Sequence, residues 1–135
     1  MSAPWRRLDP GWLAVLGLSV FAWAPLLAPG FFLEAHDARH TLFFLHAFDQ
    51  AFRDGVLIPR WCPDCALGYG YPLFLLYSPL AYYVAEGFHL LGATLTDAVK
   101  WTFGLATVLS GWGMYGWGRR LWGRAGGLLA AAVYL

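Results

Sequence analysis

Three long stretches of the chain contain no charged residue. They run from Pro10 to Leu33, from Cys65 to Ala85 and from Trp101 to Gly118. A helix crosses a bilayer with about 20 apolar residues. The pattern therefore predicts three membrane-spanning helices. Their expected ranges are 11–28, 73–91 and 98–118.

Two details modify this pattern. Pro79 lies inside the second predicted span and should kink it, because proline lacks an N–H and frees the carbonyl of Leu75. A further apolar run, 125–135, is too short to cross a bilayer, and its last carbonyl groups would lack partners in hydrocarbon. We expect a truncated fourth span there, and we expect the chain to be the N-terminal piece of a longer multi-pass protein.

A more polar loop, 30–72, separates the first two predicted spans. Its middle part, 38–54, has the periodicity of an amphipathic helix, which Gly55 should end. One face is apolar and contains Phe44, Leu45, Phe48, Ala51 and Phe52. On the polar face Asp49 and Arg53 form a favourable i,i+4 pair. We expect this helix to lie on the membrane surface; packing against another part of the protein is the alternative.

The composition agrees with a membrane protein. Hydrophobic residues make up 59% of the chain and charged residues 13%, whereas soluble domains carry about 25% charge. Aromatic residues reach 19%, as expected where rings line a lipid–water interface. The expected fold class is an all-α, multi-pass transmembrane helix bundle in a lipid bilayer. The net charge of +1 gives no indication of nucleic-acid binding.

The first span could also be read as a signal peptide. Arg6 and Arg7 precede it, and Ala22-Trp23-Ala24 resembles a cleavage site. Pro25 would follow the cut directly, which argues against cleavage, and the apolar run is long for a signal core. We therefore expect a retained anchor.

The charge count conflicts with a cytoplasmic N-terminus. With three spans, the inside would hold three basic residues: Arg6, Arg7 and Lys100. The outside would hold six: Arg39, Arg53, Arg60, Arg119, Arg120 and Arg124. That distribution opposes the positive-inside rule.

Asp37 is the first candidate for chemistry. It stands where the surface helix should begin, and His36 and His40, which would share a helix face, lie beside it. A carboxylate and a histidine at a membrane surface can act as a base or bind a divalent cation. Alternatively, Asp37 is an ordinary N-cap whose oxygen accepts a backbone N–H.

Cys62 and Cys65 form a single Cys-x-x-Cys motif. One such pair is half of a structural zinc site, and the chain has no second pair. If the loop is extracytoplasmic, a local disulfide is the simpler interpretation. A pair with no role remains equally open.

Three other features remain ambiguous. Arg60 could bind a phosphate or carboxylate, or extend to the headgroups beside aromatic residues. The Gly68-Tyr69-Gly70-Tyr71-Pro72 run would let the backbone approach a ligand, but it lacks the spacing of a dinucleotide fingerprint. Glu86 is the only carboxylate within a predicted span, near its far end. Such residues are often functional.

The order of these motifs is similar to the start of a bacterial membrane protein family. Asp37 and His40 are followed by the surface helix, Pro59-Arg60-Trp61, the glycine–tyrosine run and Tyr77-Ser78-Pro79-Leu80. This order resembles the family described as "6-pyruvoyl-tetrahydropterin synthase-related membrane domain", over about Gly11 to Leu135. More distantly, it resembles the GT-C glycosyltransferases, which take sugars from polyprenyl-phosphate carriers.

The resemblance implies a function and a set of site residues. Asp37 would be the catalytic base or the ligand of a divalent metal ion, and His40 would support it. Arg60 would meet the phosphate of a polyprenyl-phosphate-linked sugar, with Trp61 and Tyr77 also in substrate binding. The resemblance also implies a bacterial inner (plasma) membrane location, a cytoplasmic N-terminus and an extracytoplasmic loop 30–72.

Two other functions remain open. The chain could belong to a non-enzymatic transporter, flippase or cell-envelope assembly protein whose loop gates a cavity. It could also be a small membrane-anchored metal or redox module that uses Cys62 and Cys65.

Overall fold

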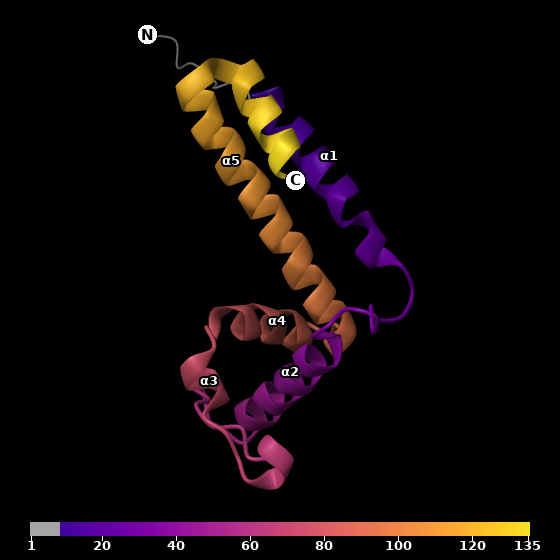
Figure 1. Ribbon diagram of the computed structural model, residues 1–135, viewed down its shortest axis with the longest axis vertical. Helices are drawn as coiled ribbons and strands as arrows, with labels where there is room; N and C mark the ends of the chain where they lie inside the picture. Colours follow the sequence, from indigo (N-terminus) through magenta and orange to yellow (C-terminus); the bar gives the residue numbers. More distant parts are fainter. Residues whose placement is uncertain (1–8) are drawn as a thin grey trace. The chain divides into compact units, whose positions relative to one another are not determined.

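The computed structural model describes residues 9–135, and Arg6 and Arg7 lie outside this range. The described chain is mostly helical, with no β-strand, which confirms the all-α class. Figure 1 shows the elements in order. They are α1 (Pro10–Trp23), η1 (Ala24–Leu27), α2 (Ala38–Arg53), η2 (Ala66–Gly68), α3 (Leu73–Leu76), α4 (Leu80–Leu90) and α5 (Leu95–Tyr134).

The chain divides into two compact units. The hairpin unit contains the residues up to Leu27 together with Phe103–Leu135. The inserted unit contains Ala28–Thr102, which joins the two parts of the hairpin unit along the chain.

In the hairpin unit, α1 and α5 run antiparallel. A Cβ added at Gly104 would meet the Trp23 ring, whereas one added at Gly11 would meet Tyr115. The contacts therefore proceed in opposite directions along the two helices. Small residues in a helix permit this close approach. Near the start of α1, the indole N–H of Trp112 also donates to the carbonyl oxygen of Trp12 at 3.2 Å.

α5 contains a sharp turn at Gly123. Its φ of 72° and ψ of −171° are not helical, and a positive φ is readily adopted by glycine alone. The following residues fold back, so that Gly127 lies against the backbone of Arg119 and Leu135 lies near Gly111. A new helical segment after Arg124, as the sequence predicts, is therefore present.

The predicted second span, 73–91, is wrong as a continuous helix. The structure has the single turn α3, then the extended residue Tyr77, and then the 11-residue α4. Pro79 does not kink a helix but begins one, because its missing N–H costs nothing there. Eleven helical residues reach about 16 Å, which is far short of the roughly 30 Å hydrocarbon core.

The helix predicted at 38–54 is confirmed as α2, but its apolar face is covered by protein. Leu45 packs with Ala85, Ala98 and Val99, and Phe48 packs in a second cluster with Phe74. The expectation of a helix lying apolar face down on the membrane is therefore wrong. Packing within the protein, the alternative, is what the structure shows.

One helical stretch among residues 9–135, Pro10–Leu27, is long and apolar enough to cross a membrane. Most of its residues are exposed, as suits a helix that meets lipid. Its length and composition support a membrane association.

Candidate functional site

Asp37 precedes α2, but its side chain does not cap the helix. The helix cap is made by its carbonyl oxygen, which accepts from the N–H and hydroxyl of Thr41 at 2.9 Å each. The carboxylate instead contacts His36 Nδ1 at 3.1 Å and lies 3.9 Å from His40 Nδ1. Its side chain is 76% exposed. The N-cap interpretation of the carboxylate is therefore wrong, and the group is open to solvent between two imidazoles.

The structure gives no support to the predicted metal site at Asp37. Within residues 9–135, no three His, Cys, Asp or Glu side chains are grouped so that they could hold a metal ion. The carboxylate and imidazoles at the start of α2 suit proton transfer better than metal binding.

The ring of Tyr77, which follows α3, packs against the same part of α2 that carries His40. Both rings flank Phe44, with centroid separations of 6.3 Å for Tyr77 and 5.9 Å for His40. Tyr77 is half-exposed. Three of the predicted site residues, Asp37, His40 and Tyr77, are thus associated with the first half of α2.

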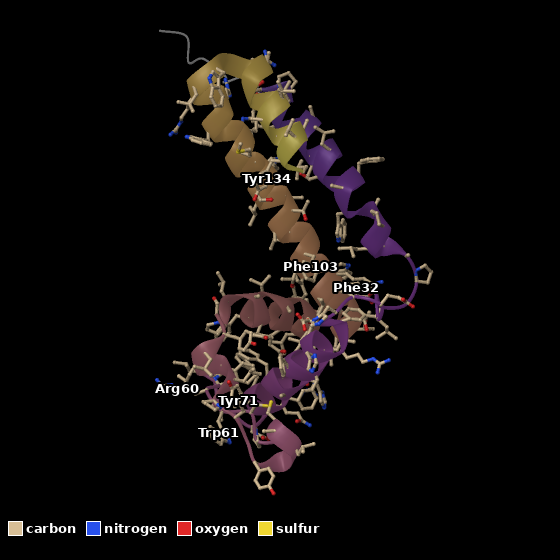
Figure 2. All side chains as sticks on the ribbon, viewed as in Figure 1. Phe32, Arg60, Trp61, Tyr71, Phe103 and Tyr134 are labelled. Atoms are coloured by element: carbon tan, nitrogen blue, oxygen red, sulfur yellow. A yellow bond between two sulfur atoms is a disulfide. The ribbon has the colours of Figure 1, made fainter. Side chains whose placement is uncertain are left out.

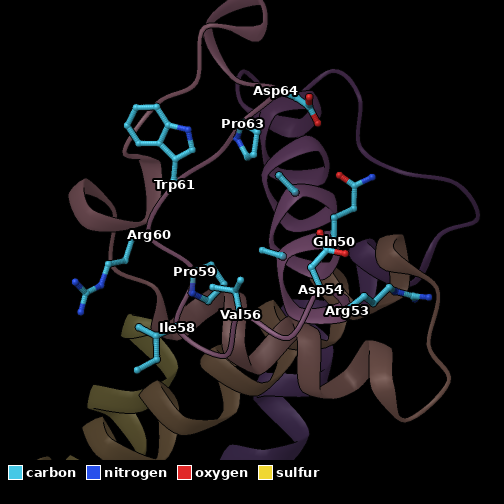
Figure 3. A pocket seen from close by; sticks show the side chains of 12 residues that line it. Gln50, Arg53, Asp54, Val56, Ile58, Pro59, Arg60, Trp61, Pro63 and Asp64 are labelled. Atoms are coloured by element: carbon cyan, nitrogen blue, oxygen red, sulfur yellow. The ribbon is translucent and has the colours of Figure 1, made fainter.

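Arg60 and Trp61 lie elsewhere, with Tyr71 nearby (Figure 2). They border a cleft of about 700 Å³ beside the last turns of α2. Its other lining residues are Ala47, Gln50, Ala51, Arg53, Asp54, Val56, Ile58, Pro59, Pro63 and Asp64. In Figure 3 the guanidinium group of Arg60 points away from α2. Because α2 rises 1.5 Å per residue, this cleft begins about 15 Å along the helix from Asp37.

Cys62 and Cys65 form a disulfide, and both are buried. The backbone of Cys62 also pairs with that of Tyr71 through two hydrogen bonds of 2.8 and 2.9 Å. The Trp61 ring packs so closely on Gly70 that a Cβ there would overlap it. The zinc interpretation of the cysteines is therefore wrong. The glycine–tyrosine run serves to close this loop.

A buried polar cluster joins α2 to α4, and the sequence did not predict it as a unit. Asp49 and Glu86 are 5% and 1% exposed. The predicted pair is confirmed, since Arg53 Nε donates to Asp49 Oδ1 at 2.7 Å. Across the helix contact, His89 Nε2 lies 3.8 Å from Asp49 Oδ1. The spacings Asp49/Arg53 and Glu86/His89 were visible in the sequence, but nothing in it joined the two helices.

Glu86 has an unusual environment in this cluster. Neither of its oxygens has a hydrogen-bond partner. Burial, and then the nearby charge of Asp49, raise the pKa of Glu86 above its ordinary value of 4.5. The expectation that Glu86 lies near a membrane interface in a spanning helix is not met, because α4 belongs to the inserted unit.

The hairpin unit has its own polar cluster, around Asp9. Its carboxylate accepts a 2.5 Å hydrogen bond from the Tyr115 hydroxyl. It also pairs with Arg119 at 2.6 Å and Arg124 at 2.8 Å. The Tyr115 hydrogen bond is the main cause that lowers the pKa of Asp9. Asp9 also accepts from the N–H of Gly11, as an N-cap of α1.

Comparison with known proteins adds no relative: the chain matches no protein family, no curated protein and no solved structure.

Proposed function

We propose that the chain is part of a GT-C-like integral membrane glycosyltransferase that uses a polyprenyl-phosphate-linked sugar at the extracytoplasmic surface. The observation that supports this most directly is Asp37. Its carboxylate is free of capping duty, lies between two histidines and comes only ten residues after the apolar stretch Pro10–Leu27. A base at that point of the chain would stand close to the surface of the bilayer.

The proposed membrane arrangement differs from a three-span count. Pro10–Leu27 crosses the bilayer, and α5 returns from Phe103 to Trp122, since the two helices run antiparallel. That part of α5 has 20 residues, or about 30 Å of helix. Its glycines and tryptophans lower its hydropathy but are common in membrane helices. The segment after Gly123 turns back toward the bilayer.

This arrangement removes the conflict in the charge count. Because Asp9 pairs with Arg119 and Arg124, that end of α5 shares the side of the N-terminus. The cytoplasm then holds five basic residues: Arg6, Arg7, Arg119, Arg120 and Arg124. The outside holds four: Arg39, Arg53, Arg60 and Lys100. The positive-inside rule therefore supports a cytoplasmic N-terminus and a multi-pass plasma-membrane protein.

The disulfide supports the same orientation. Chain connectivity assigns Ala28–Thr102 to the side opposite Asp9, which is the extracytoplasmic side. Disulfides such as Cys62–Cys65 form and persist there, whereas cytoplasmic thiols are kept reduced.

In the proposed reaction, the carboxylate of Asp37 takes the proton of an acceptor hydroxyl. The hydroxyl oxygen attacks the anomeric carbon of the donor sugar, and the bond to polyprenyl phosphate breaks. His36 and His40 lie next to the Asp37 carboxylate and influence its electrostatic environment. Tyr77 presents an exposed ring, next to Phe44, to the substrate. Arg60 and Trp61 begin about 15 Å away. They would therefore bind a part of the acceptor or of the carrier that is distant from the reacting atoms. They would not bind the carrier phosphate, which must lie beside Asp37.

Sugar transfer in membranes tests this proposal. Membranes with the protein expressed from its complete reading frame are given a polyprenyl-phosphate monosaccharide labelled in the sugar. Asp37→Asn should lower transfer about 100-fold or more, since a positioned base contributes 10²–10⁴-fold. Glu34→Gln removes an exposed carboxylate three residues before Asp37, outside the cleft at Arg60, and should transfer like the wild type. Wild-type transfer by Asp37→Asn at equal expression would exclude the role given to Asp37.

A further inference from the structure

Glu86 is a buried acidic residue, and its surroundings disfavour the ionised form. Its residue is 1% exposed, and neither carboxyl oxygen accepts a hydrogen bond. An ionised carboxylate without hydrogen bonds in the interior loses several kcal/mol of hydration with nothing in return. Buried Glu86 therefore requires either a hydrogen-bond donor for its carboxylate or a proton that makes the group neutral.

The facing helix offers a second carboxyl group, Asp49. It projects from α2 into the same contact, is 5% exposed, and its Oδ1 lies 3.8 Å from Nε2 of His89, three residues after Glu86 on α4. Two ionised carboxylates can only accept hydrogen bonds, so neither can bond the other, and their like charges repel. A protonated carboxylic acid has an O–H that can donate to the other. The pair is therefore satisfied when it holds one proton.

The surrounding positive charge is sufficient for one carboxylate. Arg53 donates from Nε to Asp49 Oδ1 at 2.7 Å. His89 uses Nδ1 for the carbonyl oxygen of Ala93 at 2.7 Å, and its Nε2 lies 3.3 Å from Arg53 Nη2. This pattern fits a neutral imidazole that donates from Nδ1 and accepts at Nε2. The guanidinium of Arg53 thus pairs with Asp49. The positive charges of Arg53 and His89 act on Glu86 from a distance, but neither side chain gives it a hydrogen-bond donor.

The other elements packed on this contact do not supply one. α5 brings Lys100 to the same unit, but its ammonium donates to the carbonyl oxygen of Ala28 at 2.7 Å. The remaining neighbours of Ala85, next to Glu86, are apolar or aromatic, including Leu45, Ala98 and Val99.

We propose that Asp49 and Glu86 form a site that binds one proton, with Glu86 as the acid and Asp49 as the carboxylate that accepts its O–H. The direction of the pKa of Glu86, raised by burial and by Asp49, agrees with this geometry. The site joins α2 to α4, so the proton acts as a ligand that stabilises this helix contact. The inference does not depend on glycosyl transfer. If the inserted unit faces outward, the contact responds to external pH.

The sign of the effect follows from linkage. An acid whose pKa is raised in the folded state binds its proton more tightly there than in the unfolded chain. Its stabilisation is complete below the unfolded value of about 4.5 and is lost as the pH rises through the folded pKa. The inserted unit should therefore weaken with rising pH.

Carbon-13 labelling of glutamate tests the wild-type chain directly. Glu34 and Glu86 are the two glutamates of the sequence, so a sample labelled at the glutamate side-chain carboxyl gives two signals. In Glu34→Gln one signal remains, which assigns Glu86. We expect this signal to change from that of a carboxylic acid to that of a carboxylate with a midpoint above the ordinary glutamate value of 4.5. A midpoint at or below that value in the folded, membrane-mimetic-bound chain would overturn the proposal.

Thermal unfolding of two matched variants provides the second readout. The amide of Glu86→Gln donates to Asp49 as the protonated acid does, so its midpoint should hardly change between about pH 5 and pH 8. Glu34→Gln removes the other glutamate charge and should keep the wild-type fall in midpoint. An equal fall in both variants contradicts the site. If Glu86→Gln does not fold, the carbon-13 titration of the wild type alone decides.

Discussion

The hairpin unit and the inserted unit each bring an acidic side chain into a helix contact, and they satisfy it in different ways. Asp9, with a 10% exposed side chain, receives a hydroxyl and two guanidinium groups, from Tyr115, Arg119 and Arg124. Glu86 receives no hydrogen-bond donor. The surroundings shift the pKa of Asp9 down and that of Glu86 up. A carboxyl group thus forms ion pairs in the hairpin unit, whereas in the inserted unit it binds a proton.

The contrast extends to packing. In the hairpin unit, glycines let helix backbones and rings come close, as at Gly11 beside Tyr115. In the inserted unit, aromatic rings fill the space around Phe48, and a disulfide closes the loop. This aromatic core packs on Tyr82 and Tyr83 of α4, which come four and three residues before Glu86. Three measurements can break or sharpen this comparison.

The largest effect is expected from the aromatic core of the inserted unit. Phe48 is fully buried and meets Phe74 and Tyr83 edge-to-face, with centroids 5.2 and 4.9 Å away. Phe48→Ala should lower the free energy of unfolding of the inserted unit by about 3–5 kcal/mol, measured by denaturant titration. Phe43, on the same helix but 41% exposed, is the matched control. Phe43→Ala should cost much less, and equal losses would contradict the assigned core.

A smaller effect, of opposite sign to that at Glu86, is expected from Asp9 in acid. Its pKa is lowered, chiefly by the Tyr115 hydrogen bond, from an ordinary value of 3.8. The stabilisation by the ionised group is therefore present above that value and is lost as the pH falls through the folded pKa. The protection factors of the α1 amides, which correct for the intrinsic pH dependence of exchange, should fall below about pH 4 in the wild type. Asp9→Asn should exchange faster already at neutral pH and respond little to acid; an acid response equal to that of the wild type would remove Asp9 from this account.

The smallest effect is expected from Arg124. Its side chain is 56% exposed, and Asp9 keeps Arg119 and Tyr115 when Arg124 is lost. Exposed ion pairs contribute little to stability. Arg124→Gln should therefore leave the thermal midpoint of the hairpin unit nearly unchanged, whereas Tyr115→Phe, which removes the hydroxyl, should lower it. A larger loss for Arg124→Gln than for Tyr115→Phe would mean that charge, not the hydrogen bond, holds Asp9.

Local features of the fold were predictable from the sequence. The 3.6-residue period at 38–54 is found as α2, Ala38–Arg53, with the Asp49–Arg53 pair on one turn. The predicted span 11–28 is found, one residue shifted, as the helical Pro10–Leu27. These features depend on residues three or four apart, which a helix alone brings together.

The candidate site was only partly predictable. Asp37, His40 and Tyr77 are associated with one half of α2, whereas Arg60 and Trp61 border the cleft at its other end. The order of motifs along the chain gave no distance between them. The long apolar run from Cys65 to Ala85 also concealed the break before Pro79, because a buried core and a bilayer select the same residues.

The sequence by itself determined the all-α class, the amphipathic α2 and the apolar helix near the N-terminus, since each depends on local periodicity and composition. Only the tertiary structure decided what covers the apolar face of α2 and which charges meet. Asp9 and Arg124 are far apart in the chain, as are Asp49 and Glu86, and no local pattern relates them. Whether a carboxyl group is an ion or an acid depends on the neighbours that folding brings to it and on the water that folding removes.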